Sequence, residues 1–112
     1  MSLQKRKRIK SKPYLEWVAT LPCAACEIRD GTVVAHHLKG RGSYLSGGMG
    51  QKAGDWLTMP LCFKCHSKMH SGDAAFMNWQ YEYILRTLDI AFNSGIIEIR
   101  ILKAKLRDTS IR

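Results

Sequence analysis

Two Cys-x-x-Cys pairs, Cys23–Cys26 and Cys62–Cys65, constrain this chain more than any other feature of its sequence. Two such pairs can place four thiolates around one ion, and four soft ligands suit tetrahedral zinc. A chain of 112 residues is near the lower limit of what one apolar core stabilises, so we expect a structural Zn²⁺ to hold the domain together. The alternatives are unrelated core cysteines, or a redox pair, for which the usual βαβ setting is absent.

The formal net charge of +9 is concentrated at the two ends. We predict a disordered basic arm over residues 1–12, a folded domain over residues 13–102 and a basic tail over residues 103–112. Basic ends can grip nucleic acid, although solubilising tails and localisation signals have the same composition. The bases of the arm that we expect to contact nucleic acid are Lys5, Arg6, Lys7 and Arg8.

The apolar runs of the chain are short. None is long enough to span a bilayer, and no apolar stretch follows the basic N-terminal residues as it would in a secretory signal. The expectation is a cytoplasmic protein without a membrane partner, in a reducing compartment where cysteines hold metal more often than they form disulfides.

Several segments have clear secondary-structure signals. A short helix is predicted after Ser11 and Pro13, a hairpin turn at Asp30-Gly31 followed by a strand over residues 32–34, and a short helix after Cys62. A longer helix, capped by residues 71–73, is predicted over about residues 74–92. Its expected core face consists of Met77, Tyr81, Ile84 or Leu85, Leu88 and Phe92.

The chain has four histidines, His36, His37, His66 and His70, all placed beside the cysteine pairs. His66 and His70 are four residues apart, so on a helix they share one face and can bind one ion. His36 and His37 are adjacent, so on a strand they point to opposite sides. One of the two can therefore join the helical pair at a metal while the other faces a substrate.

Three segments together resemble the motif of the HNH endonucleases: residues 34–38 (VAHHL), residues 55–61 (DWLTMPL) and residues 62–70 (CFKCHSKMH). That motif is a β-hairpin followed by a helix around a catalytic metal, often framed by a zinc held by four cysteines. Residues 47–56 (GGMGQKAGDW) and residues 60–62 (PLC) are similar to the phage Ref-like recombination-enhancement nucleases and related prophage proteins. The resemblance covers about residues 13–100 and implies an α+β fold: a small zinc-stapled ββα-metal (HNH) domain with flanking helices and disordered basic termini.

The resemblance also implies roles for single residues. His37 matches the general base that deprotonates water, and His36, His66 and His70 match ligands of a catalytic divalent metal, which would be Mg²⁺, Mn²⁺, Ni²⁺ or Zn²⁺. Asp55 stands for the middle residue of the motif, usually Asn, but lies two residues further from the second cysteine pair. It is therefore interpreted as the residue that orients the base, as a ligand, or as a structural residue at a strand start.

The function that the resemblance implies is metal-dependent hydrolysis of DNA phosphodiester bonds, within phage recombination and in the host cytoplasm if the chain is phage-encoded. Lys39, Arg41 and Lys52 lie in or beside a glycine-rich loop, residues 40–54, and either bind phosphates or are solvated loop cations. DNA is the expected partner, with a recombinase filament as a candidate helper, while the oligomeric state is left open. The alternatives are a non-catalytic zinc-binding nucleic-acid-binding module and a protein adaptor that uses the helix over residues 74–92.

Overall fold

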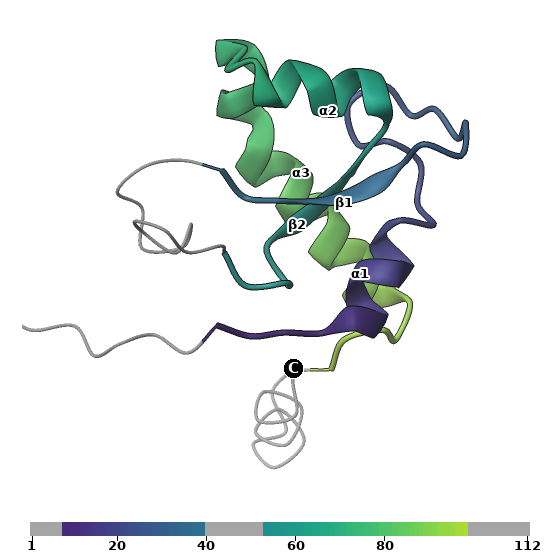
Figure 1. Ribbon diagram of the computed structural model, residues 1–112. Coiled ribbons are helices and arrows are strands. Elements are labelled where there is room, and N and C mark those ends of the chain that lie inside the picture. The colour runs from purple at the N-terminus through teal and green to yellow at the C-terminus, as the bar shows by residue number, and fades with distance from the viewer. Residues whose placement is uncertain (1–7, 40–52, 99–112) are drawn as a thin grey trace, which may run out of the picture.

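The computed structural model describes residues 8–39 and 53–98 (Figure 1). Within these ranges the chain forms α1 (Lys12–Val18), β1 (Val34–His37), β2 (Thr58–Leu61), α2 (Phe63–His70) and α3 (Ala74–Asn93). The predicted α+β class is confirmed: the described parts comprise a two-stranded sheet and three helices. None of the described helices is both long and apolar enough to cross a membrane.

Helix α1 begins as its sequence predicts. The Ser11 hydroxyl accepts a hydrogen bond from the Tyr14 amide at 3.3 Å, and Pro13 lies in the first turn, where its missing N–H costs nothing. Tyr14 and Val18 are the buried residues of the helix. Residues 8–11 precede it as an extended segment with hydrogen bonds to the domain, so the described structure begins four residues before the predicted end of the basic arm.

Strands β1 and β2 pair antiparallel, with His36 opposite Met59 and His37 opposite Thr58. The partner of β1 is thus β2, and the predicted hairpin at Asp30-Gly31 is wrong. The Asp30 carboxylate accepts hydrogen bonds from the Thr32 amide at 2.9 Å and from the Thr32 hydroxyl at 2.6 Å. This local turn occupies the amide of Thr32, and β1 therefore begins two residues later than predicted.

All four residues of β2 are buried, and the strand includes Pro60. The Pro60 carbonyl accepts a hydrogen bond from the Ala24 amide at 2.8 Å, so it points away from β1. The ring nitrogen of Pro60 lies on the same outer side, where a strand can accommodate a residue without N–H. The loop that carries the first cysteine pair is attached to β2 through this bond.

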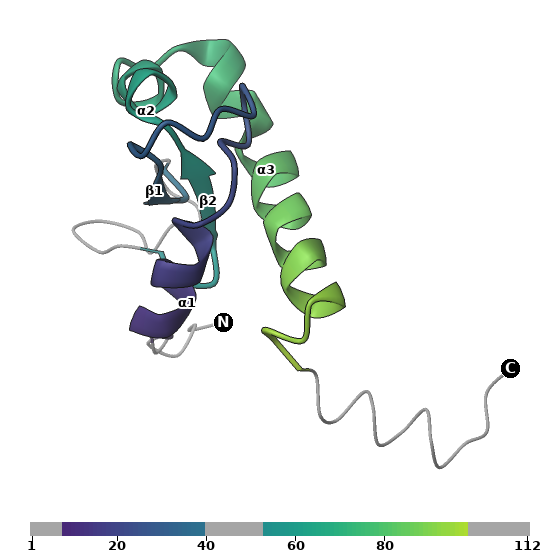
Figure 2. The same ribbon diagram turned by 90° about the vertical axis from the view of Figure 1, so that its right-hand side faces the viewer.

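Helices α2 and α3 follow β2, and both were predicted. Asp73 caps α3 by accepting hydrogen bonds from the amides of Ala75 and Phe76. Figure 2 shows α3 running beside β2, with α1 near the lower end of the sheet and α2 above it. The core between these elements includes Val18, Met59, Leu61, Met69, Ile84 and three of the four cysteines.

The predicted buried face of α3 is right in part: Ile84 and Leu88 are buried as predicted, and Met77 packs against the core. The observed buried face is formed by residues at positions 80, 84, 87, 88 and 91, whereas Tyr81 and Leu85 are 49% and 62% exposed, and Phe92 is exposed as well. The predicted face is therefore wrong at Tyr81 and Phe92, and of the two alternatives Ile84 and Leu85 it is Ile84 that is buried. Large apolar side chains occur on both sides of α3, so hydrophobicity alone does not select the core face.

Candidate metal centres and the histidine–aspartate pair

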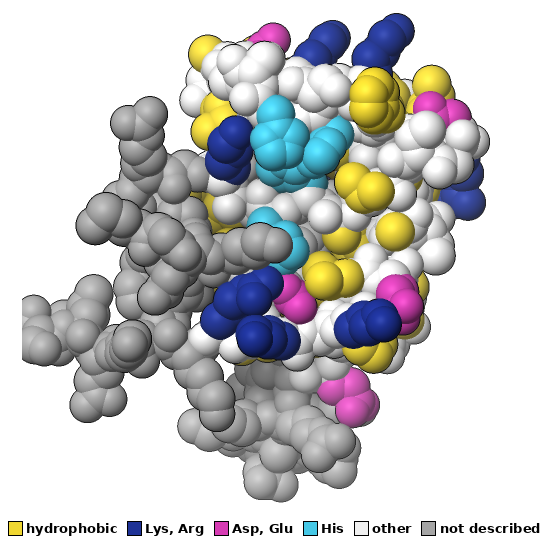
Figure 3. Space-filling model, viewed as in Figure 1, with side chains coloured by type: hydrophobic (Ala, Val, Ile, Leu, Met, Phe, Trp, Pro, Cys, Tyr) yellow, Lys and Arg dark blue, Asp and Glu magenta, His cyan; other side chains and the backbone are white. Residues whose placement is uncertain are grey.

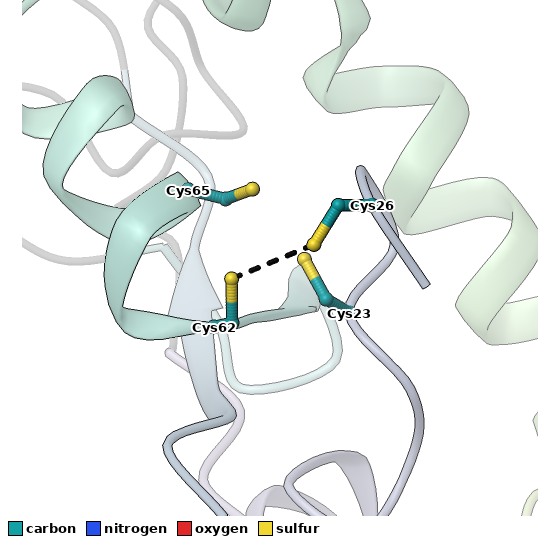
Figure 4. Close-up of side chains that lie close together, drawn as sticks. All are labelled: Cys23, Cys26, Cys62 and Cys65. Carbon is teal, nitrogen blue, oxygen red and sulfur yellow. Dashed lines mark hydrogen bonds between the residues drawn. The ribbon is translucent and has the colours of Figure 1, made fainter. Parts of the chain in front are cut away.

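The four cysteines form one cluster (Figure 4), with side chains that point toward one another from the loop after α1 and from the start of α2. Their sulfur atoms all lie within 4.8 Å of one another, and Sγ of Cys26 is 3.6 Å from Sγ of Cys62. Zn–S bonds of about 2.3 Å in a tetrahedron separate sulfur atoms by about 3.8 Å. The predicted cluster is therefore present, and it could hold a structural zinc ion.

The surroundings of the cluster favour thiolates at one corner and oppose them at another. Burial disfavours the charged form of Cys23, but hydrogen bonds from the backbone amides of Cys62, Cys26 and Ala25 outweigh it and lower the pKa of Cys23 to about 7. Burial, together with the neighbouring thiols, raises the pKa of Cys65. A divalent cation at the centre would offset the repulsion between four closely spaced thiolates, which fits a metal-binding role.

The loop between Cys23 and Ile28 is shaped for this cluster. The Glu27 amide donates to the Cys23 carbonyl at 2.8 Å, and the Cys23 amide donates to the Ile28 carbonyl at 3.0 Å. Glu27 adopts a φ of 64°, a left-handed conformation that usually falls to glycine. This strained backbone conformation accompanies a turn in which the sulfur atoms of Cys23 and Cys26 face the second cysteine pair.

Three histidines form a second cluster. His36 projects from β1, and His66 and His70 project from α2, with their Nε2 atoms 3.0 Å apart and the ligand atoms of all three rings within 4.8 Å. His36 is 6% exposed, and its Nδ1 is buried without a hydrogen-bond partner. Burial and the neighbouring rings of His66 and His70 lower the pKa of His36 to about 4. A buried, neutral imidazole beside two others is a set of donors that fits a divalent transition metal.

His37 makes a different contact. Its Nε2 lies 2.9 Å from Oδ1 of Asp55, whose side chain is 6% exposed. Burial raises the pKa of Asp55, but hydrogen bonds from His37 and Ser11 and the charge of Arg8 together lower it below the usual value. An ionised carboxylate can only accept, so Nε2 of His37 donates to Asp55, and in the neutral ring Nδ1 is then the nitrogen with the lone pair.

The same carboxylate also binds the segment before α1. Arg8 donates from Nη2 to Oδ1 at 3.0 Å, and the Ser11 amide donates to Oδ2 at 2.8 Å. Of the three roles left open for Asp55, orientation of His37 is the one that these contacts suit. Asp55 does not belong to either group of the described residues whose ligand atoms could meet at one ion.

Both histidine groups lie on one face of the molecule (Figure 3), with Lys or Arg side chains beside each. Lys39 Nζ is 3.5 Å from Nδ1 of His70, so this predicted phosphate ligand does lie at the histidine cluster. Arg8, predicted to contact nucleic acid, is 31% exposed and is paired with Asp55. The other predicted nucleic-acid contacts lie outside the described residues: Lys5, Arg6, Lys7, Arg41 and Lys52.

Comparison with known proteins identifies the family. Residues 1–95 match DUF968, whose description is a protein of unknown function. The chain belongs to DUF968. The uncharacterized protein YdfU of Escherichia coli K12 is 40% identical over 100 residues, a match that covers 87% of this chain and 27% of that protein. This DUF968 chain therefore spans about a quarter of the length of that relative, and no solved structure matches it.

One buried polar contact beside the histidines of this DUF968 domain was not predicted. Gln80 of α3 is 2% exposed; its Oε1 accepts from the Lys39 amide and its Nε2 donates to the Lys39 carbonyl, both at 2.7 Å. The two bonds fix the chain where it leaves β1, directly after the histidine pair. The sequence feature that could have indicated this contact is a polar residue between Met77 and Ile84, on the face of α3 that is buried.

Proposed function

We propose that this chain is a metal-dependent endonuclease of the HNH type that hydrolyses DNA phosphodiester bonds. The observation that carries the proposal is the placement of the His37–Asp55 pair beside the three-histidine cluster on a β1–β2–α2 unit. His36 and His37 are adjacent on β1, so strand alternation directs one to the cluster and the other to Asp55. Both groups lie on one face of the molecule (Figure 3), so a single phosphate could meet the ligands for a cation and the oriented imidazole together.

The chemistry divides between these two groups. His37 would accept the proton of the attacking water at Nδ1, because its Nε2–H is already committed to Asp55. A divalent metal, when bound by His36, His66 and His70, would supply Lewis-acid stabilisation of the charge that develops on the phosphoryl and leaving oxygens. Lys39 is placed to bind a phosphate next to the cut, since its ammonium group lies at the rim of the histidine cluster.

The cysteine cluster supports the proposal indirectly. It holds the start of α2 against the loop that precedes β1, and α2 carries two of the three histidines. A structural zinc would thereby fix the distance between the helix and the strand that together form the second metal site. The assignment to the Ref-like branch, the role in phage recombination and the recombinase filament as a helper are parts of this proposal that come from the sequence resemblance.

The test is a cleavage assay on supercoiled plasmid and on labelled single-stranded DNA, with Mg²⁺, Mn²⁺, Ni²⁺ or Zn²⁺ and with EDTA. Wild type and His37→Ala are purified in parallel, so that a contaminating nuclease appears equally in both. We expect metal-dependent cutting that falls at least about 100-fold in His37→Ala, since a positioned general base contributes on the order of 100- to 10,000-fold. DNA binding and zinc content should be unchanged in the variant.

Equal cutting by wild type and His37→Ala would refute the assigned base. Binding of DNA without cutting, under every metal and also after addition of a recombinase filament, would instead establish the non-catalytic zinc-binding nucleic-acid-binding module. The cysteine cluster and the basic ends serve both functions equally, so they do not decide between them.

A further inference from the structure

The segment before α1 is attached to the loop before β2 through hydrogen bonds at residues 53–55. Arg8 makes two of these hydrogen bonds: Nη2 donates to Asp55 Oδ1 at 3.0 Å, and Nε donates to the Ala53 carbonyl at 3.1 Å. The Ser11 amide donates to Asp55 Oδ2, and the Asp55 amide donates to the Ile9 carbonyl, both at 2.8 Å. Residues more than forty positions apart in the sequence are thus joined by four hydrogen bonds.

These contacts determine how the Asp55 carboxylate is oriented. Ser11 holds Oδ2, and Arg8 holds Oδ1, so the group cannot rotate without losing a bond at each oxygen. The same Oδ1 receives the hydrogen bond from Nε2 of His37 at 2.9 Å. Arg8 and His37 therefore donate to the same carboxylate oxygen, although Arg8 comes from the part of the chain expected to be a disordered arm.

We propose that Arg8 is a positioning residue for His37: it holds the Asp55 carboxylate so that Oδ1 faces Nε2 of His37 and leaves Nδ1 free. The proposal rests on the proposed nuclease function, in which His37 is the base. It changes the role of the N-terminal segment, because residues 8–11 then complete the site as well as adding positive charge. A guanidinium suits this task, since its fixed fork can bind a carbonyl and a carboxylate together, which a lysine ammonium cannot do in the same geometry.

The competing role for Arg8 is the one that its charge suggests, direct contact with a DNA phosphate. Lys10 provides the matched control, because it lies in the same segment, is exposed and carries the same charge without a contact to Asp55 among the described residues. Loss of either charge weakens attraction to DNA. Only loss of Arg8 disturbs the Asp55 carboxylate.

The experiment compares full-length, zinc-loaded wild type, Arg8→Ala, Arg8→Lys and Lys10→Ala by two readouts. The first is a ¹⁵N–¹H correlation spectrum of the histidine rings at alkaline pH, with resonances assigned through His37→Ala, which reports which ring nitrogen carries the proton. The second is the kcat and KM for cutting of a labelled oligonucleotide. Thermal unfolding and zinc content accompany each variant.

We expect wild-type His37 to be protonated at Nε2 and Arg8→Ala to show a mixture of the two tautomers. Its kcat should fall about 10- to 100-fold, as is usual when a supporting hydrogen-bond partner is removed. Arg8→Lys should be intermediate, and Lys10→Ala should alter KM while its His37 signals match those of wild type. Should Arg8→Ala fail to fold, Arg8→Lys gives the same comparison with the charge retained.

Unchanged His37 signals together with an unchanged kcat in Arg8→Ala would overturn the proposal. A rise in KM alone, equal to that of Lys10→Ala, would overturn it as well and assign Arg8 to phosphate binding. If wild type does not cut DNA, the proposed function fails, while the spectra still decide whether Arg8 sets the tautomer of His37.

Discussion

Replacement of Asp55 by Asn tests the contacts on which the site depends. Three donors meet at this carboxylate: His37 Nε2 and Arg8 Nη2 at Oδ1, and the Ser11 amide at Oδ2. An asparagine side chain of the same shape has one oxygen and one NH₂ group. If its oxygen faces His37 and Arg8, the NH₂ group opposes the Ser11 amide; if it faces Ser11, the NH₂ group opposes the other two donors.

Either orientation leaves at least one donor unpaired at a site where the original side chain is 6% exposed. An unsatisfied buried donor costs about 1–3 kcal/mol, and the remaining bonds lose their assistance from the negative charge. We therefore expect Asp55→Asn to lower the free energy of unfolding by about 2–4 kcal/mol. For a domain of this size that corresponds to a fall in Tm of roughly 10–25 °C.

The assay is urea and thermal unfolding of the zinc-loaded proteins, with Asp30→Asn as the matched control. Asp30 also accepts two hydrogen bonds, but from Thr32 in a fully exposed turn that asparagine can maintain, so its variant should unfold like wild type. Equal stability of Asp55→Asn and wild type would refute the three-donor arrangement.

The difference in the free energy of unfolding between wild type and Asp55→Asn should depend on pH with a definite sign. Burial opposes the charge of Asp55, but its donors prevail and its pKa lies below the ordinary value of 3.8. A depressed pKa contributes stability that is present above the unfolded pKa and is lost only as the pH falls through the folded pKa. The difference between wild type and Asp55→Asn should therefore be fully present above the unfolded pKa and shrink as the pH falls from about 5 toward the folded pKa. A difference that does not shrink on acidification would show that the stabilisation does not come from the ionised carboxylate of Asp55.

Three further perturbations have clear expected outcomes. Removal of metal by a chelator, or the substitution Cys62→Ser, should unfold the domain, because binding of a structural zinc typically contributes about 10 kcal/mol or more. Circular dichroism measures the unfolding, and a zinc-release assay measures the loss of metal. A stable, zinc-free Cys62→Ser protein would refute the structural role of the zinc. Glu27→Gly should raise the free energy of unfolding by about 0.5–1 kcal/mol in urea titrations, since glycine adopts its φ of 64° without strain, and a destabilised variant would contradict this. Gln80→Leu should lower the free energy of unfolding by about 1–3 kcal/mol in the same titrations, because it leaves the Lys39 amide and carbonyl unpaired. Asn78→Leu, on the exposed side of α3, is the control. Equal effects of the two substitutions would show that Gln80 does not hold the Lys39 backbone in place.

The sequence predicted the elements whose signals are local. Ser11 with Pro13 and the cap Asp73 marked the starts of α1 and α3, and these starts agree with the structure. The spacing of the cysteine pairs predicted their cluster, because four metal-ligand side chains rarely occur at such spacings without meeting. The histidine pair His66 and His70 was predicted in the same way, from the period of a helix.

Contacts between distant segments lacked such a signal. Arg8 lies in the predicted basic arm and Asp55 directly follows the glycine-rich loop, and neither the period nor the composition of those segments indicates that they touch. Gln80 lies on the core face of α3 because the backbone of Lys39 satisfies both ends of its amide, which depends on how α3 is rotated about its axis. The apolar side chains on both faces of α3 concealed that rotation, so Tyr81 and Phe92 were wrongly assigned to the core face while Ile84 and Leu88 were assigned correctly.

Pro60 has a consequence for how copies of this protein can associate. On the outer side of β2 its ring nitrogen has no hydrogen to donate, and its carbonyl is already bonded to Ala24. A strand from a second molecule would find neither a donor nor a free acceptor at this residue, so the sheet cannot be extended there by intermolecular pairing. This block protects the β2 edge of a very short sheet against aggregation by intermolecular strand pairing.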